Sequence, residues 1–127
     1  GYAVMPEALA VKLRARMTGS LSVVTMAAAS ASLRDQAFVA DTRAKIQAGR
    51  DALIAELRAL GRTWAEPHGN FVFFQTGMPI AEFLPKMRAE GIEVGRAFPP
   101  LLDWARISIG LPDEMAACHR ALRKVLG

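Results

Sequence analysis

A long amphipathic stretch in the middle of the chain constrains the fold most. From Val39 to Leu60, large apolar side chains recur every seven residues, while the opposite face carries mostly charged residues. This period is that of an α-helix with one buried face. We therefore predict a helix over residues 36–60, capped at its start by Asp35 and ended by Gly61.

The residues before this stretch predict two further helices. Apolar residues recur every four positions from Leu9 to Met17, and Pro6 suits the first turn of a helix there. Residues 21–33 are rich in small side chains, which indicates either a closely packed helix or an extended entry followed by a helix. Residues 2–5 are apolar and are compatible with a short strand.

The pattern changes after Gly61. Apolar runs that are typical of strands now alternate with amphipathic stretches, in the order strand, helix, strand, strand, helix. The predicted strands are residues 71–74, 92–94 and 104–110, and the predicted helices are residues 79–90 and 112–126. The turn-rich residues 64–70 and the loop 95–103 connect them. We predict an α+β fold, in which helices cover a small sheet.

The last predicted strand contains an unexpected charge. Side chains alternate between the two faces of a strand. Ala105, Ile107 and Ile109 would therefore face the core, whereas Trp104 and Arg106 would lie on the other face. Arg106 has two interpretations: an edge-strand arginine that extends into water, or an anion site, because a guanidinium matches a carboxylate with two parallel hydrogen bonds.

Composition and charge exclude several classes of function. The 127 residues carry sixteen basic and twelve acidic side chains, a net charge of +4, and the basic residues are scattered rather than clustered. This distribution argues against a nucleic-acid partner. No apolar run is long enough for a membrane span, and the first residues lack the features of a signal peptide. The single cysteine excludes a disulfide within the chain.

Few residues have the surroundings that catalysis requires. All four lysines lie in amphipathic stretches among other charges, which is not the apolar setting of a Schiff-base lysine. Cys118 and His119 are adjacent in a predicted helix and would point about 100° apart, so they do not form a nucleophile–base pair. No glycine-rich phosphate motif is present. Arg96 and Arg106 remain, and both are predicted at the ends of neighbouring strands, where they could face one anion.

The order of these features resembles the last part of class I/II aminotransferases, the fold-type-I enzymes that depend on pyridoxal phosphate. The closest resemblance is to the histidinol-phosphate aminotransferase branch. The match covers nearly the whole chain. The segments that carry it are Gly1–Tyr2, residues 21–33, Asp35–Phe38, His68–Val72, Gly91–Val94, and Arg106–Gly110 followed by Pro112–Glu114.

The resemblance implies roles for three residues. In that family the arginine of the "R-I-S-I-G" segment binds the substrate carboxylate, and Arg106 stands at this position. Arg96 is the nearest match to the arginine of "G-I-x-V-R", displaced by the insertion of Gly95. Asn70 matches the asparagine of "A-N-F" and would shape the site. Leu111 replaces the usual threonine, which removes a helix-capping hydroxyl.

The resemblance also implies which parts of the enzyme lie elsewhere. The lysine and the other groups that hold pyridoxal phosphate precede the "G-Y" segment in the family, and the chain looks cut at its start. We therefore expect this chain to be the C-terminal part of an amino-acid aminotransferase and to bind the carboxylate of a small amino-acid or oxo-acid substrate. By itself it would neither bind the cofactor covalently nor transaminate. The parent enzyme would be a cytoplasmic homodimer.

The expected organisation has three parts. Residues 1–35 would be the tail of the large cofactor-binding domain, residues 36–60 a bridging helix, and residues 61–127 the small C-terminal domain. Two alternatives remain open: a decarboxylase of a phosphorylated amino acid with the same fold, and a non-catalytic α+β binding or assembly module. A truncated domain would expose apolar side chains on residues 1–35.

Overall fold

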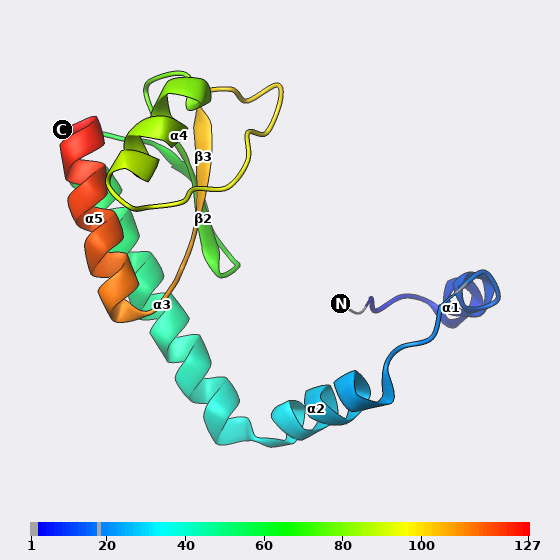
Figure 1. Cartoon of the computed structure of the whole chain (residues 1–127). Helices are drawn as coiled ribbons and strands as arrows, with labels where there is room; N and C mark the ends of the chain where they lie inside the picture. The colour runs from blue at the N-terminus through cyan, green and yellow to red at the C-terminus, as the bar shows by residue number, and fades with distance from the viewer. Residues whose placement is uncertain (1–2, 18) are drawn as a thin grey trace. The chain divides into compact units, whose positions relative to one another are not determined.

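The computed structural model describes residues 3–17 and 19–127, and its backbone divides into two compact units, residues 1–39 and 40–127. Figure 1 shows the course of the chain. The elements are α1 (Glu7–Arg14), α2 (Val23–Arg34), α3 (Gln36–Ala59), β1 (Trp64–Ala65), β2 (Phe71–Gln75), α4 (Ile80–Ala89), β3 (Trp104–Ser108) and α5 (Pro112–Leu126).

The first unit consists mainly of α1 and α2, and neither helix has a buried residue. Their apolar side chains are exposed, as predicted for residues 1–35; Val23 and Val24 are 75% and 78% exposed. Residues 19–22 before helix α2 are not helical, which agrees with the alternative of an extended entry followed by a helix. Residues 3–5 form no strand, so that expectation is wrong for them, and Tyr2 lies outside the described residues.

Helix α3 confirms the prediction for the middle of the chain. The backbone N–H of Phe38 donates to Asp35 Oδ1 at 2.9 Å, which is the expected N-terminal cap. The helix ends before Gly61, whose φ of +66° belongs to the left-handed region that glycine tolerates best. Leu53 and Leu57, in the second half of α3, are fully buried in the core.

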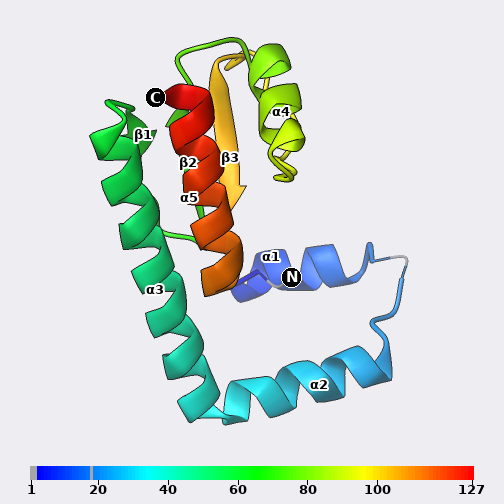
Figure 2. The same cartoon turned by 60° about the vertical axis from the view of Figure 1, so that its left-hand side comes forward.

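The second unit is built on a three-stranded antiparallel sheet of order β1-β2-β3. Phe74 lies opposite Ala105, and Val72 lies opposite Ile107. These four side chains are buried and face the core. The same core contains residues of α3, α4 and α5, so the helices cover one face of the sheet (Figure 2). The predicted α+β architecture is confirmed for this unit.

Two details of the sheet differ from the prediction. Residues 92–94 are not a strand, although Val94 is buried; the Ile92 N–H donates to the Met87 carbonyl of α4 instead of to a neighbouring strand. Residues 64–65, predicted as part of a turn-rich region, form β1. Strand formation requires a partner at hydrogen-bond distance, and the local pattern does not contain this information.

The two C-terminal helices agree closely with their predictions. Helix α4 continues through Pro85 as far as Ala89. Helix α5 starts at Pro112, and the Glu114 carboxylate accepts a hydrogen bond from the Leu111 N–H at 2.7 Å. This contact satisfies an N–H at the start of the helix and partly replaces the capping hydroxyl that Leu111 lacks.

Burial predicts which leucines hold the second unit together. The substitution Leu57→Ala removes a fully buried side chain, so the free energy of unfolding should fall by about 2–5 kcal/mol. The matched substitution Leu33→Ala changes a side chain that is 68% exposed and should have an effect within about 0.5 kcal/mol. Urea unfolding followed by circular dichroism measures both. Equal losses would contradict the assigned core.

Candidate anion site on the sheet

Strand β3 presents Arg106 on the sheet face opposite the helices. Ala105 and Ile107 are buried, whereas Arg106 and Ser108 are exposed, as the alternation predicted. Arg106 lies opposite Phe73 in the register of β2 and β3. The strand therefore fixes the direction of the guanidinium through the burial of its two neighbours.

Aromatic rings surround the Arg106 guanidinium. Its Cζ lies 5.3 Å from the ring centre of Phe71 and 5.3 Å from that of Phe98. Phe98 also packs edge-to-face on Phe73 at 5.5 Å, and Phe73 lies 5.0 Å from Trp104. Rings at these distances attract a cation without neutralising its charge. Within the described residues, no carboxylate pairs with Arg106.

Arg96 reaches the same aromatic ring as Arg106. Its Cζ lies 4.7 Å from the ring centre of Phe98, and its guanidinium donates to the Ala97 carbonyl at 3.2 Å. No acidic side chain in the described part of the chain pairs with it. The structure thus brings the two predicted arginines together through Phe98. Arg96 stands in a loop rather than at the end of a strand, because residues 92–94 are not paired.

Asn70 borders this face through its backbone. It directly precedes Phe71, and its carbonyl accepts a hydrogen bond from the Ile109 N–H at 2.8 Å. The bond ties the start of β2 to the end of β3. Asn70 therefore helps to position the ring that contacts Arg106, and its side chain is exposed.

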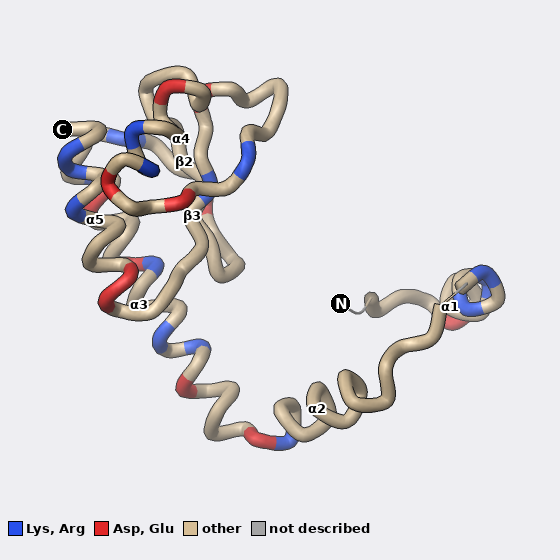
Figure 3. Tube along the Cα trace, viewed as in Figure 1, with Lys and Arg blue, Asp and Glu red and all other residues tan. Residues whose placement is uncertain are grey.

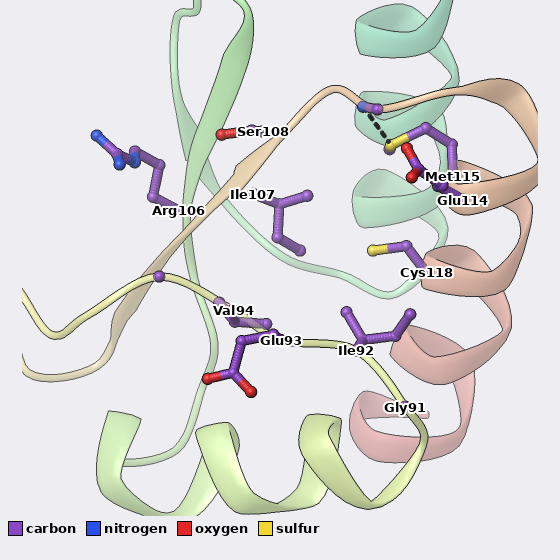
Figure 4. A pocket seen from close by; sticks show the side chains of 12 residues that line it. Gly91, Ile92, Glu93, Val94, Arg106, Ile107, Ser108, Glu114, Met115 and Cys118 are labelled. Atoms are coloured by element: carbon purple, nitrogen blue, oxygen red, sulfur yellow. Dashed lines mark hydrogen bonds between the residues drawn. The ribbon is translucent and has the colours of Figure 1, made fainter.

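A cavity of about 330 Å³ opens beside β3. It lies between residues 91–95, the free edge of β3 and the start of α5 (Figure 4). Cys118 lines it, and burial raises the pKa of this thiol to about 11, so the group stays protonated at neutral pH. Cys118 is a core residue here, as its position in the sequence indicated.

A second cavity, of about 400 Å³, was not predicted from the sequence. It lies between α3 and α5 and is lined mainly by small and apolar side chains, among them Ala48, Ala52 and Ala116, with Lys45 and His119. A Cβ on Gly49 would lie 2.7 Å from Ile109 Cγ2, so this glycine permits the close approach of α3 to the chain that follows β3. The signal in the sequence is the recurrence of small residues in this part of α3, at Ala44, Ala48, Gly49 and Ala52.

Comparison with known proteins identifies the family. The profile described as "Aminotransferase class I and II" matches residues 1–124. The chain belongs to the class I and II aminotransferases. Relatives of this aminotransferase chain include a histidinol-phosphate aminotransferase of Symbiobacterium thermophilum, 34% identical over all of this chain and 36% of the relative. Another, from Pseudomonas fluorescens, is 32% identical over 99% of this chain and 35% of its own length.

Solved aminotransferase structures resemble the fold. A putative histidinol-phosphate aminotransferase of Erwinia carotovora atroseptica has a TM-score of 0.73 and 36% identity, over 76% of this chain and 28% of that one. A putative aminotransferase of Burkholderia pseudomallei has a TM-score of 0.82 and 25% identity, over 96% and 38%. The chain spans about a third of the length of the curated relatives it matches.

The lysines of this aminotransferase chain do not fit a covalent cofactor anchor. Lys45 and Lys124 form ion pairs with Asp41 and Glu90, and both side chains are at least 70% exposed. Lys12 and Lys86 are also exposed. None is enclosed by apolar groups, as a Schiff-base lysine requires. The described residues also contain no cluster of side chains that could hold a metal ion.

The charged residues of this aminotransferase chain do not form a basic surface. Lysine and arginine are interspersed with acidic residues along the helices (Figure 3). Four ion pairs among the described residues show this mixing: Lys45–Asp41, Arg88–Glu93, Arg123–Glu56 and Lys124–Glu90. No helix in the described residues is long and apolar enough to cross a membrane.

His119 makes the stability of the second unit depend on pH. Its Nε2 is buried without a hydrogen-bond partner, and the Glu56–Arg123 ion pair lies close by. The pKa of His119 is lowered, and burial is the largest cause; the charge of Glu56 raises this pKa and that of Arg123 lowers it. The unfolded chain therefore binds this proton more readily, and folding stability is lost as the pH falls below about 6.5.

The substitution His119→Gln should flatten the decline in stability between pH 7 and pH 5. The thermal midpoint, measured in steps across this range, reports the difference. The control His68→Gln removes an exposed histidine and should retain the decline of the wild type. If both variants retain it, the titration of His119 does not account for the pH dependence.

Proposed function

We propose that this chain is the substrate-gripping C-terminal part of a pyridoxal-phosphate-dependent amino-acid aminotransferase, in which Arg106 binds the substrate carboxylate. One observation carries the proposal. Arg106 is exposed between two aromatic rings without an acidic partner in the described residues. It also stands in a segment that resembles the carboxylate-binding segment of the family.

The chemistry of the proposed role is orientation. A guanidinium that donates two parallel hydrogen bonds fixes both the position and the plane of a carboxylate. Phe71 and Phe98 restrict the movement of the Arg106 guanidinium, so less conformational freedom is lost when the ligand binds. A fixed carboxylate in turn fixes the bonds at the adjacent carbon, which is how a binding residue accelerates a reaction carried out by other groups.

Arg96 and Asn70 have supporting roles in this proposal. Arg96 contributes a second positive charge next to Phe98 and attracts anionic ligands to the same face. Asn70 keeps Phe71 in place through its backbone bond to Ile109. The relatives reported above are named aminotransferases, which favours transamination over decarboxylation and over a non-catalytic module.

The cofactor and the remaining parts of the enzyme are assigned to the longer protein. Pyridoxal phosphate supplies the electron sink of aminotransferase chemistry when it is bound. The lysines of this chain do not fit the covalent anchor of this cofactor. We propose that the complete protein is a cytoplasmic homodimer that acts on a small amino-acid or oxo-acid substrate.

The carboxylate site is tested by substitution of Arg106. NMR titration with pyruvate, an oxo acid with one carboxylate, should shift the Nε–Hε resonance of Arg106 in the wild type. The variant Arg106→Lys keeps the charge but loses the planar fork, so the dissociation constant should rise about tenfold, the equivalent of about 1.4 kcal/mol. Arg106→Gln should bind more weakly still.

Arg120 is a matched control for this titration. It is an exposed arginine on α5, and Arg120→Gln removes the same charge from another surface. This variant should bind pyruvate as the wild type does. If Arg120→Gln weakens binding as much as Arg106→Gln, the chain attracts pyruvate by net charge alone, and the proposed site is wrong.

If the covalent anchor of the cofactor lies elsewhere in the longer protein, this chain should not bind pyridoxal phosphate covalently. The 127-residue chain, mixed with an equimolar amount of pyridoxal phosphate, passed through a desalting column and then treated with borohydride, should show no added phosphopyridoxyl mass. The physical reason is that its lysines are exposed and charged. One stoichiometric adduct at a single lysine in the mass spectrum would contradict the proposal.

A further inference from the structure

The acidic side chains that line the cavity beside β3 do not pair with Arg106, the arginine that lines it. Two carboxylates line it, those of Glu93 and Glu114, and both are held by groups other than Arg106. Glu114 accepts the Leu111 N–H at 2.7 Å. Glu93 accepts two hydrogen bonds from the Arg88 guanidinium, at 2.9 and 2.6 Å. The guanidinium of Arg106 thus has no acidic partner in the described residues, although two carboxylates line the same cavity.

Glu93 belongs to a segment that is held by side-chain contacts rather than by backbone pairing. We call residues 93–97 the strap. Within the described residues, the strap makes no backbone–backbone hydrogen bond. It nevertheless lies beside β3, because a Cβ placed on Gly95 would be 3.7 Å from the Arg106 carbonyl oxygen. Val94 anchors it in the core that also contains Ile107.

Glu93 and Arg106 line the same cavity, although their side chains do not pair. Val94 and Ile107 both face the core, so their neighbours in each extended segment face the other way. If the strap aligned fully along β3, Glu93 would therefore lie on the same face as Arg106. In the structure the two side chains instead point in different directions (Figure 4), because Glu93 turns towards Arg88 of α4.

We propose that Arg88 is a positioning residue: its ion pair with Glu93 holds this carboxylate away from Arg106 and keeps the Arg106 guanidinium open to a carboxylate ligand. This inference rests on the proposed function. Without Arg88, the carboxylate of Glu93, which lines the same cavity as Arg106, is released next to a guanidinium that has no acidic partner in the described residues. It becomes an internal competitor for the site.

The energetics allow such a switch. The Arg88 and Glu93 side chains are 69% and 70% exposed, and exposed ion pairs form and break easily. Hydrogen bonds from Arg88 hold the pKa of Glu93 below its ordinary value, so the carboxylate stays charged while the pair exists. If Glu93 occupied Arg106 for between half and nine-tenths of the time, the apparent dissociation constant of a ligand would rise about twofold to tenfold.

The first measurement needs no ligand. In Arg88→Gln, the Nε–Hε resonance of Arg106 should shift as Glu93 approaches, and in the double variant Arg88→Gln/Glu93→Gln it should return to its wild-type position. Lys124→Gln is the matched control, because it breaks the Lys124–Glu90 pair and removes the same charge from a side chain that is 70% exposed. It should leave the Arg106 resonance unchanged.

The second measurement is the pyruvate titration. Arg88→Gln should weaken binding about twofold to tenfold, and the double variant should restore it, whereas Glu93→Gln and Lys124→Gln should bind as the wild type does. A loss in Arg88→Gln that the double variant fails to restore would overturn the inference, as would an equal loss in Lys124→Gln.

The two measurements separate this inference from the proposed function. If Arg106→Gln abolishes pyruvate binding but Arg88→Gln changes neither the resonance nor the affinity, the carboxylate site stands and the role of Arg88 is wrong. If pyruvate does not bind through Arg106, the proposed function fails. The ligand-free resonance then still decides whether Arg88 keeps Glu93 away from Arg106.

Discussion

The burial of Ala105 and Ile107 under the helices is the constraint on which the candidate site depends. Both residues are almost inaccessible, and they alternate with Arg106 along β3. A shift of the strand by one residue would place a guanidinium in the core and two apolar side chains in water. The hydrophobic core therefore sets the direction of the charge. Helices α4 and α5 complete this core and so support the strand from behind.

The second feature of the site is a local excess of positive charge, at Arg96 and Arg106. Among the described residues of the second unit, Lys45, Arg88, Arg123 and Lys124 form ion pairs, and the pair Arg123–Glu56 joins α5 to α3. Arg96 and Arg106 instead contact the ring of Phe98. The face of an aromatic ring attracts a cation without neutralising its charge, whereas a carboxylate neutralises it. The proposed function uses this local positive charge to bind an anion.

The sequence predicted most of the elements because their signals are local. The seven-residue repeat of α3, the cap at Asp35 and the alternation in β3 depend on neighbours in the chain, and all three are present. Residues 92–94 have the composition of a strand but remain unpaired. Trp64–Ala65, in a stretch of turn residues, pairs with β2. Pairing depends on distant segments, and for this reason the local pattern was insufficient in both places.

The division of the chain into compact units depends on contacts between residues that are distant in the sequence. The predicted boundaries at residues 35 and 60 followed the ends of the long helix, whereas the structure divides the chain between Val39 and Ala40, within α3. Whether residues 1–35 belong to a large cofactor-binding domain stays a prediction. Their exposed apolar side chains, such as Val23, are what such an origin would produce.

The sequence by itself determined the class of fold, the alternation that turns Arg106 outward and the family resemblance, because each depends on the order of residues along the chain. Only the tertiary structure decided which groups surround that arginine. Phe71 and Phe98 lie 35 and 8 residues from Arg106 in the sequence, yet both rings contact it. Arg88 and Glu93 form an ion pair between α4 and the segment that follows it. These contacts depend on the packing of the sheet and α4, and no local period in the sequence encodes them.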